Sequence, residues 1–235
     1  MSNTILSSDL EAVKRFLLKR GILSKSSMLK CEKTVSQIHR RVYSFAILEQ
    51  SFRSKNPATH FLSEMKSDAF QILPICLMGY RKLAYLLLRG LIENSLSYIF
   101  YFHHEIEYMK LDLFAKQFMT ITDLSNYVVR HPLLLEPLRQ FDFITPLKAK
   151  YFQISRVVHA ASIKNMQLLR GLSSIGYDHS LVEQVKDEMA EVTKLVIFML
   201  CKFHWREFTL LQPRIRGLIL LNLPADLKRR LFSIK

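Results

Sequence analysis

One segment restricts the possible folds of this chain more than any other. Residues 83–102 are apolar on nearly every side of a helix, so they must be buried among other helices or within a membrane. A membrane-spanning helix needs roughly 20 consecutive apolar residues, and Arg89, Glu93 and Asn94 interrupt this run. The segment therefore predicts the central buried helix of a soluble protein.

The rest of the chain also favours helices. Within residues 27–52, Val35, Ile38 and Val42 recur three or four positions apart, which is the helical spacing. No series of segments alternates as strands do, and the 235 residues include only 6 glycines and 7 prolines. We expect an all-α fold: an antiparallel bundle of roughly seven to nine helices with a kinked central buried helix. Pro74 should kink or break the helical run in which it lies.

Positive charge is concentrated at the two ends of the chain. Of the formal net charge of +14, residues 1–60 carry +7 and residues 205–235 carry +5. A charge of this size favours nucleic acid, an anionic membrane surface or an acidic protein as partner. We divide the chain into a basic N-terminal helical region, residues 1–55, and a bundle with a basic C-terminal helix, residues 56–235. We expect the two to form one compact domain.

The cysteines and the N-terminus indicate a reducing compartment. Cys31, Cys76 and Cys201 lie far apart and form no CxxC pair, and an odd number of cysteines argues against a disulfide framework. The first helix is charged throughout and does not have the pattern of a signal peptide. We expect a cytoplasmic protein without a membrane span.

The usual motifs for cofactors and metals do not occur in this sequence. It has no GxxxxGK[ST], GxGxxG, GxSxG or HExxH motif, and no Cys/His cluster with zinc spacing. His103 and His104, with Glu105 and Glu107, come nearest to a metal site, but neighbouring residues on a helix point about 100° apart. We interpret them as a solvated helix end, and we expect no metal site and no cofactor.

The first candidate for chemistry is the pair Arg89 and Glu93 in the apolar segment. The two residues are four apart and therefore share one face of a helix. A charged pair in such a helix must be desolvated, and it is tolerated only with good partners. Two interpretations follow. The pair is an internal salt bridge that fixes the register of the bundle, or it orients a reactive group on a neighbouring helix.

The second candidate is the set Ser155, Arg156 and His159. Ser155 and His159 are four residues apart on one face, and Arg156 is three residues from His159. Histidine suits proton transfer near neutral pH, and an adjacent arginine could hold a phosphate and stabilise negative charge. Ser155 is a weaker candidate nucleophile, because no third orienting group is evident. The alternative is that His159 is a hydrogen-bonded core residue.

Together the two candidates resemble a known family. LRGLIEN at residues 88–94 and ISRVVHA at residues 154–160 are similar to prokaryotic HEPN-type helical domains, in which an LRxxxE helix precedes an LSxxVH helix. Ile154 stands here in place of the leucine. The resemblance covers about residues 60–210 and implies an antiparallel helical bundle, often dimeric, so that residues 56–235 would be a HEPN-like bundle.

The resemblance also implies an activity. Active HEPN members resemble metal-independent ribonucleases, in which Arg and His from paired subunits promote attack of a ribose 2′-hydroxyl on the adjacent phosphate. His159 would be the general acid/base, Arg156 the phosphate-binding arginine, and Arg89 and Glu93 the supporting pair. The usual motif separates Arg from His by about four to six residues, whereas two residues separate Arg156 from His159. Many members belong to toxin–antitoxin or phage-defence systems.

Three functions stay open on the sequence alone. The first is a ribonuclease of a toxin or phage-defence system, and the second is a non-catalytic nucleic-acid-binding or protein-interaction subunit of a defence ribonucleoprotein. The third is membrane-surface binding through the amphipathic residues 223–232. The expected partners are RNA or a ribonucleoprotein, together with a second copy of the chain or a protein from the same operon. Unless they are only solvated surface, the candidate nucleic-acid-binding residues are Lys14, Arg15, Lys19, Arg20, Lys33, Arg40, Arg41, Lys228, Arg229 and Arg230.

Overall fold

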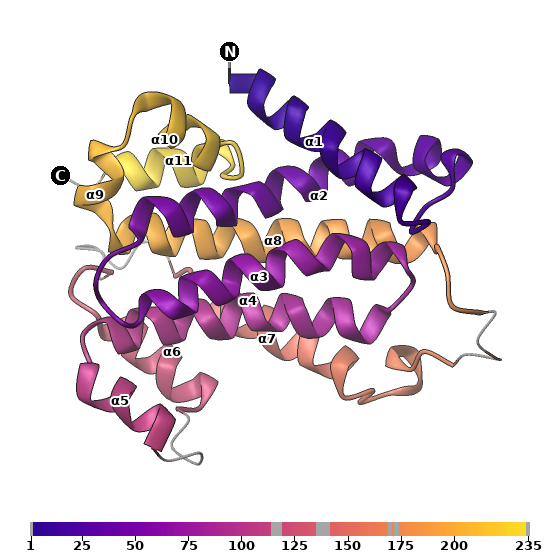
Figure 1. Ribbon diagram of the computed structural model, residues 1–235. Coiled ribbons are helices and arrows are strands. Elements are labelled where there is room, and N and C mark those ends of the chain that lie inside the picture. Colours follow the sequence, from indigo (N-terminus) through magenta and orange to yellow (C-terminus); the bar gives the residue numbers. More distant parts are fainter. Residues whose placement is uncertain (1, 114–118, 135–141, 169–170, 172–173, 234–235) are drawn as a thin grey trace.

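The protein is all-helical in the part of the chain that the structure describes. The computed structural model describes residues 2–113, 119–134, 142–168, 171 and 174–233, and no strand occurs among them (Figure 1). The α-helices are α1 (Ser2–Lys19), α2 (Lys25–Phe52), α3 (Thr59–Leu77), α4 (Arg81–Phe102), α5 (Glu105–Leu113), α6 (Ile121–Arg130), α7 (Ile144–Val158), α8 (His179–Phe203), α9 (Trp205–Leu210), α10 (Pro213–Leu220) and α11 (Ala225–Phe232).

The described residues thus form eleven α-helices, against the seven to nine expected. One of the boundaries that raise the count lies between α8 and α9. His204 separates them with φ −101° and ψ 38°, outside the helical region. Its buried imidazole contacts the Tyr98 hydroxyl, with 2.6 Å between His204 Nε2 and Tyr98 Oη. A tertiary contact therefore accompanies a break that the local sequence does not signal.

The helix that contains most of the apolar segment lies at the centre of the bundle. α4 packs against α3, α7, α8, α6 and α5, and Figure 1 shows α2, α3, α4, α7 and α8 lying side by side along the length of the molecule. Leu88, Leu91 and Ile92 of α4 are fully buried. Pro74 lies in α3, which continues past it to Leu77. A kink there stays a prediction.

The basic ends of the chain join the same hydrophobic core. α2 packs against α3 and α8, α10 packs against α2, and α11 packs against α8. The core includes Val35 and Ile38 of α2 as well as Leu227 and Leu231 of α11. Because Leu227 and Leu231 are buried while Phe232 is exposed, most of the apolar face of α11 packs on the protein itself and little of it is available to a membrane surface.

Local signals place the ends of several helices. The Ser24 hydroxyl accepts a hydrogen bond from the Ser27 amide at the start of α2, and the Asp178 carboxylate caps α8 in the same way. Gly79 turns the chain from α3 into α4 with φ +84°, a conformation that glycine adopts without strain. Within the described residues, no helix has the length and apolar character needed to cross a membrane.

Candidate functional site

α4 and α7 bring the two sequence candidates together. Arg89 donates from Nε and Nη2 to Glu93 Oε1 at 3.0 and 2.8 Å, so the expected pair forms within α4. Arg89 Nη1 lies 3.1 Å from Nε2 of His159 at the end of α7. The Arg89 and Glu93 side chains are 22% and 38% exposed, so the pair lies at the edge of the bundle. The pair is therefore partly desolvated, and it has the good partners that such a pair needs.

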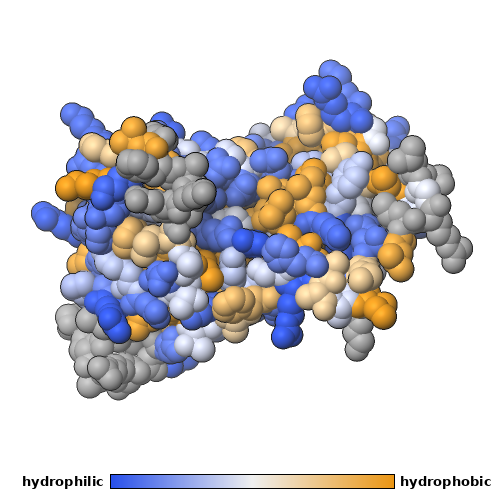
Figure 2. Space-filling view, turned by 90° about the horizontal axis from the view of Figure 1, so that it is seen from below, coloured by the Kyte–Doolittle hydropathy of each residue, from blue (hydrophilic) through white to orange (hydrophobic). Residues whose placement is uncertain are grey.

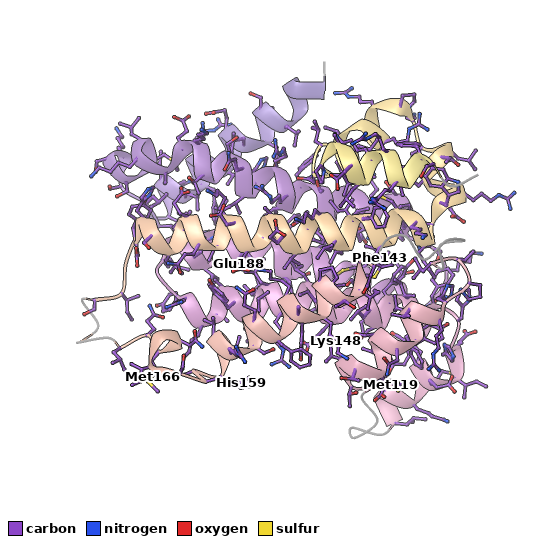
Figure 3. The ribbon with its side chains drawn as sticks, turned by 180° about the vertical axis from the view of Figure 1, so that it is seen from behind. Met119, Phe143, Lys148, His159, Met166 and Glu188 are labelled. Carbon is purple, nitrogen blue, oxygen red and sulfur yellow. The ribbon has the colours of Figure 1, made fainter. Side chains whose placement is uncertain are left out.

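His159 is exposed at the C-terminal cap of α7, where Figure 3 shows it at the opposite end of the helix from Phe143. A guanidinium can only donate hydrogen bonds, so Nε2 of His159 is the acceptor in its contact with Arg89. The neutral ring then carries its proton on Nδ1. The alternative of a hydrogen-bonded core histidine is therefore half right, since His159 is hydrogen-bonded but not buried.

Tyr151 is a member of this group that the sequence reasoning missed. Its hydroxyl donates to Glu93 Oε1 at 2.8 Å, and the Arg89 guanidinium lies 5.1 Å from the centre of its ring. Burial and the nearby Glu93 carboxylate raise the pKa of Tyr151, so the phenol stays a neutral donor. The available signal was spacing, because Tyr151 precedes His159 by two helical turns. We call Arg89, Glu93, Tyr151 and His159 the α4–α7 group.

Asp68, in α3, lies against the stretch of α4 that carries Arg89 and Glu93. The Asn94 amide donates to Asp68 Oδ2 at 3.2 Å, and a Cβ at Gly90 would collide with the Asp68 carboxylate. Glycine therefore permits the close approach of α3 and α4. Burial, with smaller effects from Glu64 and Glu93, raises the pKa of Asp68 to about 7. A carboxyl group that titrates near neutral pH thus lies beside the α4–α7 group.

Ser155 and Arg156 are less closely engaged. Ser155 is on the face of α7 that carries Tyr151 and His159, and its buried Oγ lies near Tyr151 without a well-formed hydrogen bond to any group. It therefore makes no nucleophile–base pair with His159. Arg156 is exposed, and no acidic side chain of the described residues lies within 4.0 Å of its charge. Its guanidinium is accessible to an anion.

The backbone directly after His159 is strained. Ala160 has φ +49°, a region that residues other than glycine seldom occupy, and it is the one such residue in the described ranges. The Ala160 amide donates to Val157 O at 3.2 Å, and the Ala161 amide donates to Arg156 O at 2.9 Å. These are the two hydrogen bonds of a Schellman motif, which usually has glycine at this position. The tight turn fixes where α7 ends and thereby where His159 lies.

The candidate nucleic-acid-binding residues fall into three situations. Lys14 forms salt bridges with Glu11 and Glu32, so its charge is compensated. Arg40 and Arg41 are half-buried and line a pocket between α2 and α8. The remaining seven lie at the surface, exposed or half-buried: Arg15, Lys19, Arg20, Lys33, Lys228, Arg229 and Arg230.

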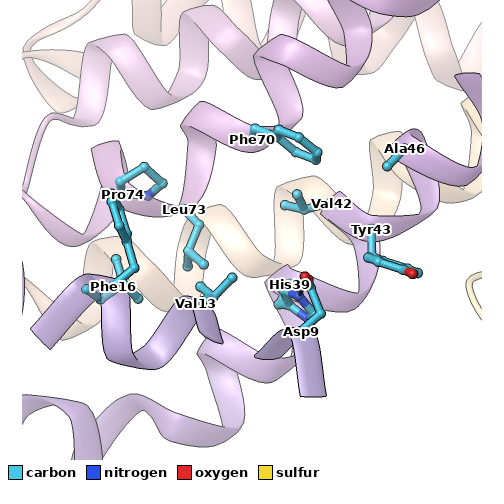
Figure 4. Close-up of a pocket in the computed structure, with 11 residues that line it drawn as sticks. Asp9, Val13, Phe16, His39, Val42, Tyr43, Ala46, Phe70, Leu73 and Pro74 are labelled. Atoms are coloured by element: carbon cyan, nitrogen blue, oxygen red, sulfur yellow. Dashed lines mark hydrogen bonds and ion pairs between the residues drawn. The ribbon is translucent and has the colours of Figure 1, made fainter. Parts of the chain in front are cut away.

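A different pocket, of about 320 Å³, lies between α1, α2 and α3 (Figure 4). Its lining is mostly apolar and includes Phe16, Val42 and Phe70. Asp9 and His39 form its polar wall, with 2.6 Å between Asp9 Oδ2 and His39 Nε2. The carboxylate and the imidazole are hydrogen-bond partners of each other, so this mostly apolar pocket suits an apolar group.

No group of three His, Cys, Asp or Glu side chains in the described ranges is arranged to hold a metal ion. His103, one of the histidines considered for that role, instead stacks on His131, with ring centroids 5.2 Å apart. On the face of the molecule seen from below, apolar residues are exposed among hydrophilic ones (Figure 2).

When the chain was compared with protein-family models, curated proteins and solved structures, none matched it.

Proposed function

We propose that this chain is a HEPN-like protein that engages RNA and cleaves it without a metal ion, in a toxin or phage-defence setting. The observation that supports the proposal best is the contact between Arg89 and His159. These residues are 70 positions apart in the sequence, and their side chains meet at the surface. Glu93 holds the arginine in place from the same helix.

The chemistry would be a transesterification. The ribose 2′-oxygen bonds to phosphorus, the bond to the 5′-oxygen breaks, and the products are a 2′,3′-cyclic phosphate and a 5′-hydroxyl. A phosphate that binds Arg89 would replace His159 as the acceptor of its Nη1 hydrogen. His159 Nε2 would then be free to take the proton of the 2′-hydroxyl. Arg156, accessible one turn before His159 on α7, would bind the phosphate as well.

The leaving 5′-oxygen needs a proton, and a second copy of the chain could supply the group that gives it. Exposed apolar side chains lie near the α4–α7 group: Leu86 is one turn before Arg89, and Phe152 follows Tyr151. Exposed apolar residues of this kind favour a protein interface. A homodimer or a partner protein from the same operon would cover them.

The experiment is RNA cleavage by the purified protein in the presence of a chelator. Wild type should produce 2′,3′-cyclic phosphate ends, and His159→Ala should lower the rate about 10²–10⁴-fold, the usual contribution of a general acid or base. His179→Ala is the matched control, because His179 is also exposed but begins α8. Equal activity of wild type and His159→Ala would overturn the ribonuclease assignment.

The second candidate function is a non-catalytic RNA-binding subunit of a ribonucleoprotein complex. The contact between Arg89 and His159 also favours this function, because Arg89 donates to His159 Nε2 and a general base needs that nitrogen free. In that case no variant cleaves RNA, and the protein binds RNA with an affinity that falls steeply as salt rises.

A further inference from the structure

The α2–α8 pocket has a predominantly cationic lining. It has a volume of about 320 Å³ and is walled by α2, by α8 and by residues 221–224, which connect α10 to α11. Its lining includes three positively charged side chains, those of Arg40, Arg41 and Lys194. Glu191 is the one acidic residue there and forms a salt bridge with Lys194. The lining therefore has a net charge of +2.

The two arginines are only weakly compensated from within the protein, by the exposed Asp187 carboxylate near Arg41, which also pairs with Lys186. In the described part of the chain, no carboxylate forms a salt bridge with Arg40 or Arg41. Arg41 Nη1 donates a hydrogen bond to the Gln37 carbonyl oxygen at 2.7 Å. Burial, and then the neighbouring Arg40 charge, lower the pKa of Arg41. Two adjacent guanidinium groups that are partly withdrawn from water repel each other unless an anion lies between or beside them.

An unsatisfied donor points to the same place. Five buried side-chain polar atoms among the described residues have no hydrogen-bond partner, and one of them is Arg40 Nε of this lining, which can donate to an anion. Such atoms are uncommon in native proteins, because a buried group normally finds a partner. The α11 helix begins at Ala225, directly after the lining residue Pro224, and has no side-chain cap. The start of a helix adds partial positive charge.

We propose that the α2–α8 pocket binds a phosphate group. A tetrahedral oxyanion offers several acceptors in different directions, which suits two guanidinium forks and one ammonium better than a planar carboxylate does. The volume admits a phosphate with part of an attached sugar. The site goes beyond the proposed ribonuclease, because it uses none of the α4–α7 group and requires no bond to be broken. The phosphate could belong to a free phosphorylated compound or to an RNA strand.

The test is thermal unfolding in inorganic phosphate, compared with sodium chloride of equal ionic strength. Phosphate at ten times its dissociation constant should raise the melting temperature by about 3–6 °C. Arg40→Gln should abolish this shift. Lys30→Gln is the matched control, because it removes an exposed cation from the same helix, and it should keep the shift. Circular dichroism shows whether each variant is folded.

Lys194→Gln provides a second variant if Arg40→Gln does not fold, and it should weaken phosphate binding by reducing the positive charge. The source of the phosphate is distinguished with a short RNA. If RNA phosphate occupies the pocket, inorganic phosphate competes with RNA, and Arg40→Gln weakens both. If the ligand is a free phosphorylated compound, Arg40→Gln loses phosphate binding but keeps RNA binding. A phosphate shift that is absent, or the same in both pocket variants as in wild type, overturns the proposal, whatever the outcome of the cleavage assay.

Discussion

The α4–α7 group and the α2–α8 pocket are both built around arginine, yet their charges are handled in opposite ways. In the α4–α7 group, Arg89 has its donors directed to Glu93 and His159. In the α2–α8 pocket, Arg40 and Arg41 form no salt bridge within the described part of the chain, and only the exposed Asp187 carboxylate lies near Arg41. The first arrangement fixes the orientation of the Arg89 guanidinium, and the second leaves the positive charges of Arg40 and Arg41 available to an anion. Geometry should therefore matter most in the α4–α7 group, and charge in the pocket.

The largest expected effect tests that difference directly. Arg89→Lys keeps the charge but cannot reach Glu93 and His159 together, because an ammonium lacks the planar fork of arginine. We expect RNA cleavage to fall about 10²–10³-fold, as when one oriented donor is lost from an active site. In the pocket, Arg41→Lys should weaken RNA binding by no more than about threefold, since lysine also binds phosphate.

Cleavage rates and RNA dissociation constants of the two variants give the comparison. Its control is a pair of melting curves showing that both variants are folded. Should Arg41→Lys weaken RNA binding as severely as Arg89→Lys reduces cleavage, the pocket would depend on geometry too, and the contrast between the two regions would be wrong.

A second difference is the response to pH. Asp68, beside the α4–α7 group, has a pKa raised to about 7 by burial, so the folded protein holds its proton more tightly than the unfolded chain does. Stability should therefore fall as the pH rises from about 4 to about 7 and change no further above it. The arginines of the pocket stay charged throughout this range.

Asp68→Asn removes the titration while keeping an acceptor for Asn94. We expect it to raise the free energy of unfolding at pH 8 by about 4 kcal/mol, because the pKa shift is about three units and each unit corresponds to about 1.36 kcal/mol. The gain should be small near pH 4. Urea unfolding at the two pH values measures it. Asp187→Asn, an exposed carboxylate, should change stability by less than about 0.5 kcal/mol at either pH. An equal effect of Asp68→Asn at both pH values would mean that Asp68 does not titrate in this range.

Sequence reasoning found the parts of the α4–α7 group that rest on residue type and local spacing. Arg89 and Glu93 pair because they are four apart on a helix. Sequence indicated that Arg89 or Glu93 could act on a neighbouring helix, but not that Arg89 itself meets His159. Tyr151 and Asp68 were missed, because tyrosine is common in cores and Asp68 comes from α3, where its sequence neighbours give no signal.

The α2–α8 pocket also depends on tertiary contacts that the sequence does not reveal. The sequence presents Arg40 and Arg41 as two more surface cations, because it shows neither their burial nor the approach of residues 221–224 from the far end of the chain. For the fold, helical spacing predicted the all-α class and the buried segment around α4. The break at His204 could not be predicted, because it accompanies a contact with Tyr98, 106 residues away.

The smallest expected effect concerns backbone strain, which the described residues show beside His159 and not around the pocket. Ala160 has φ +49°, and glycine adopts this conformation without the clash of a Cβ. Ala160→Gly should therefore stabilise the fold by about 0.5–1 kcal/mol and raise the melting temperature by about 1–4 °C. Ala161→Gly, one residue on and without a positive φ, should give no gain because glycine only adds freedom to the unfolded chain. If Ala160→Gly lost stability instead, the turn that holds His159 against Arg89 would be stabilised by the alanine methyl group rather than strained by it.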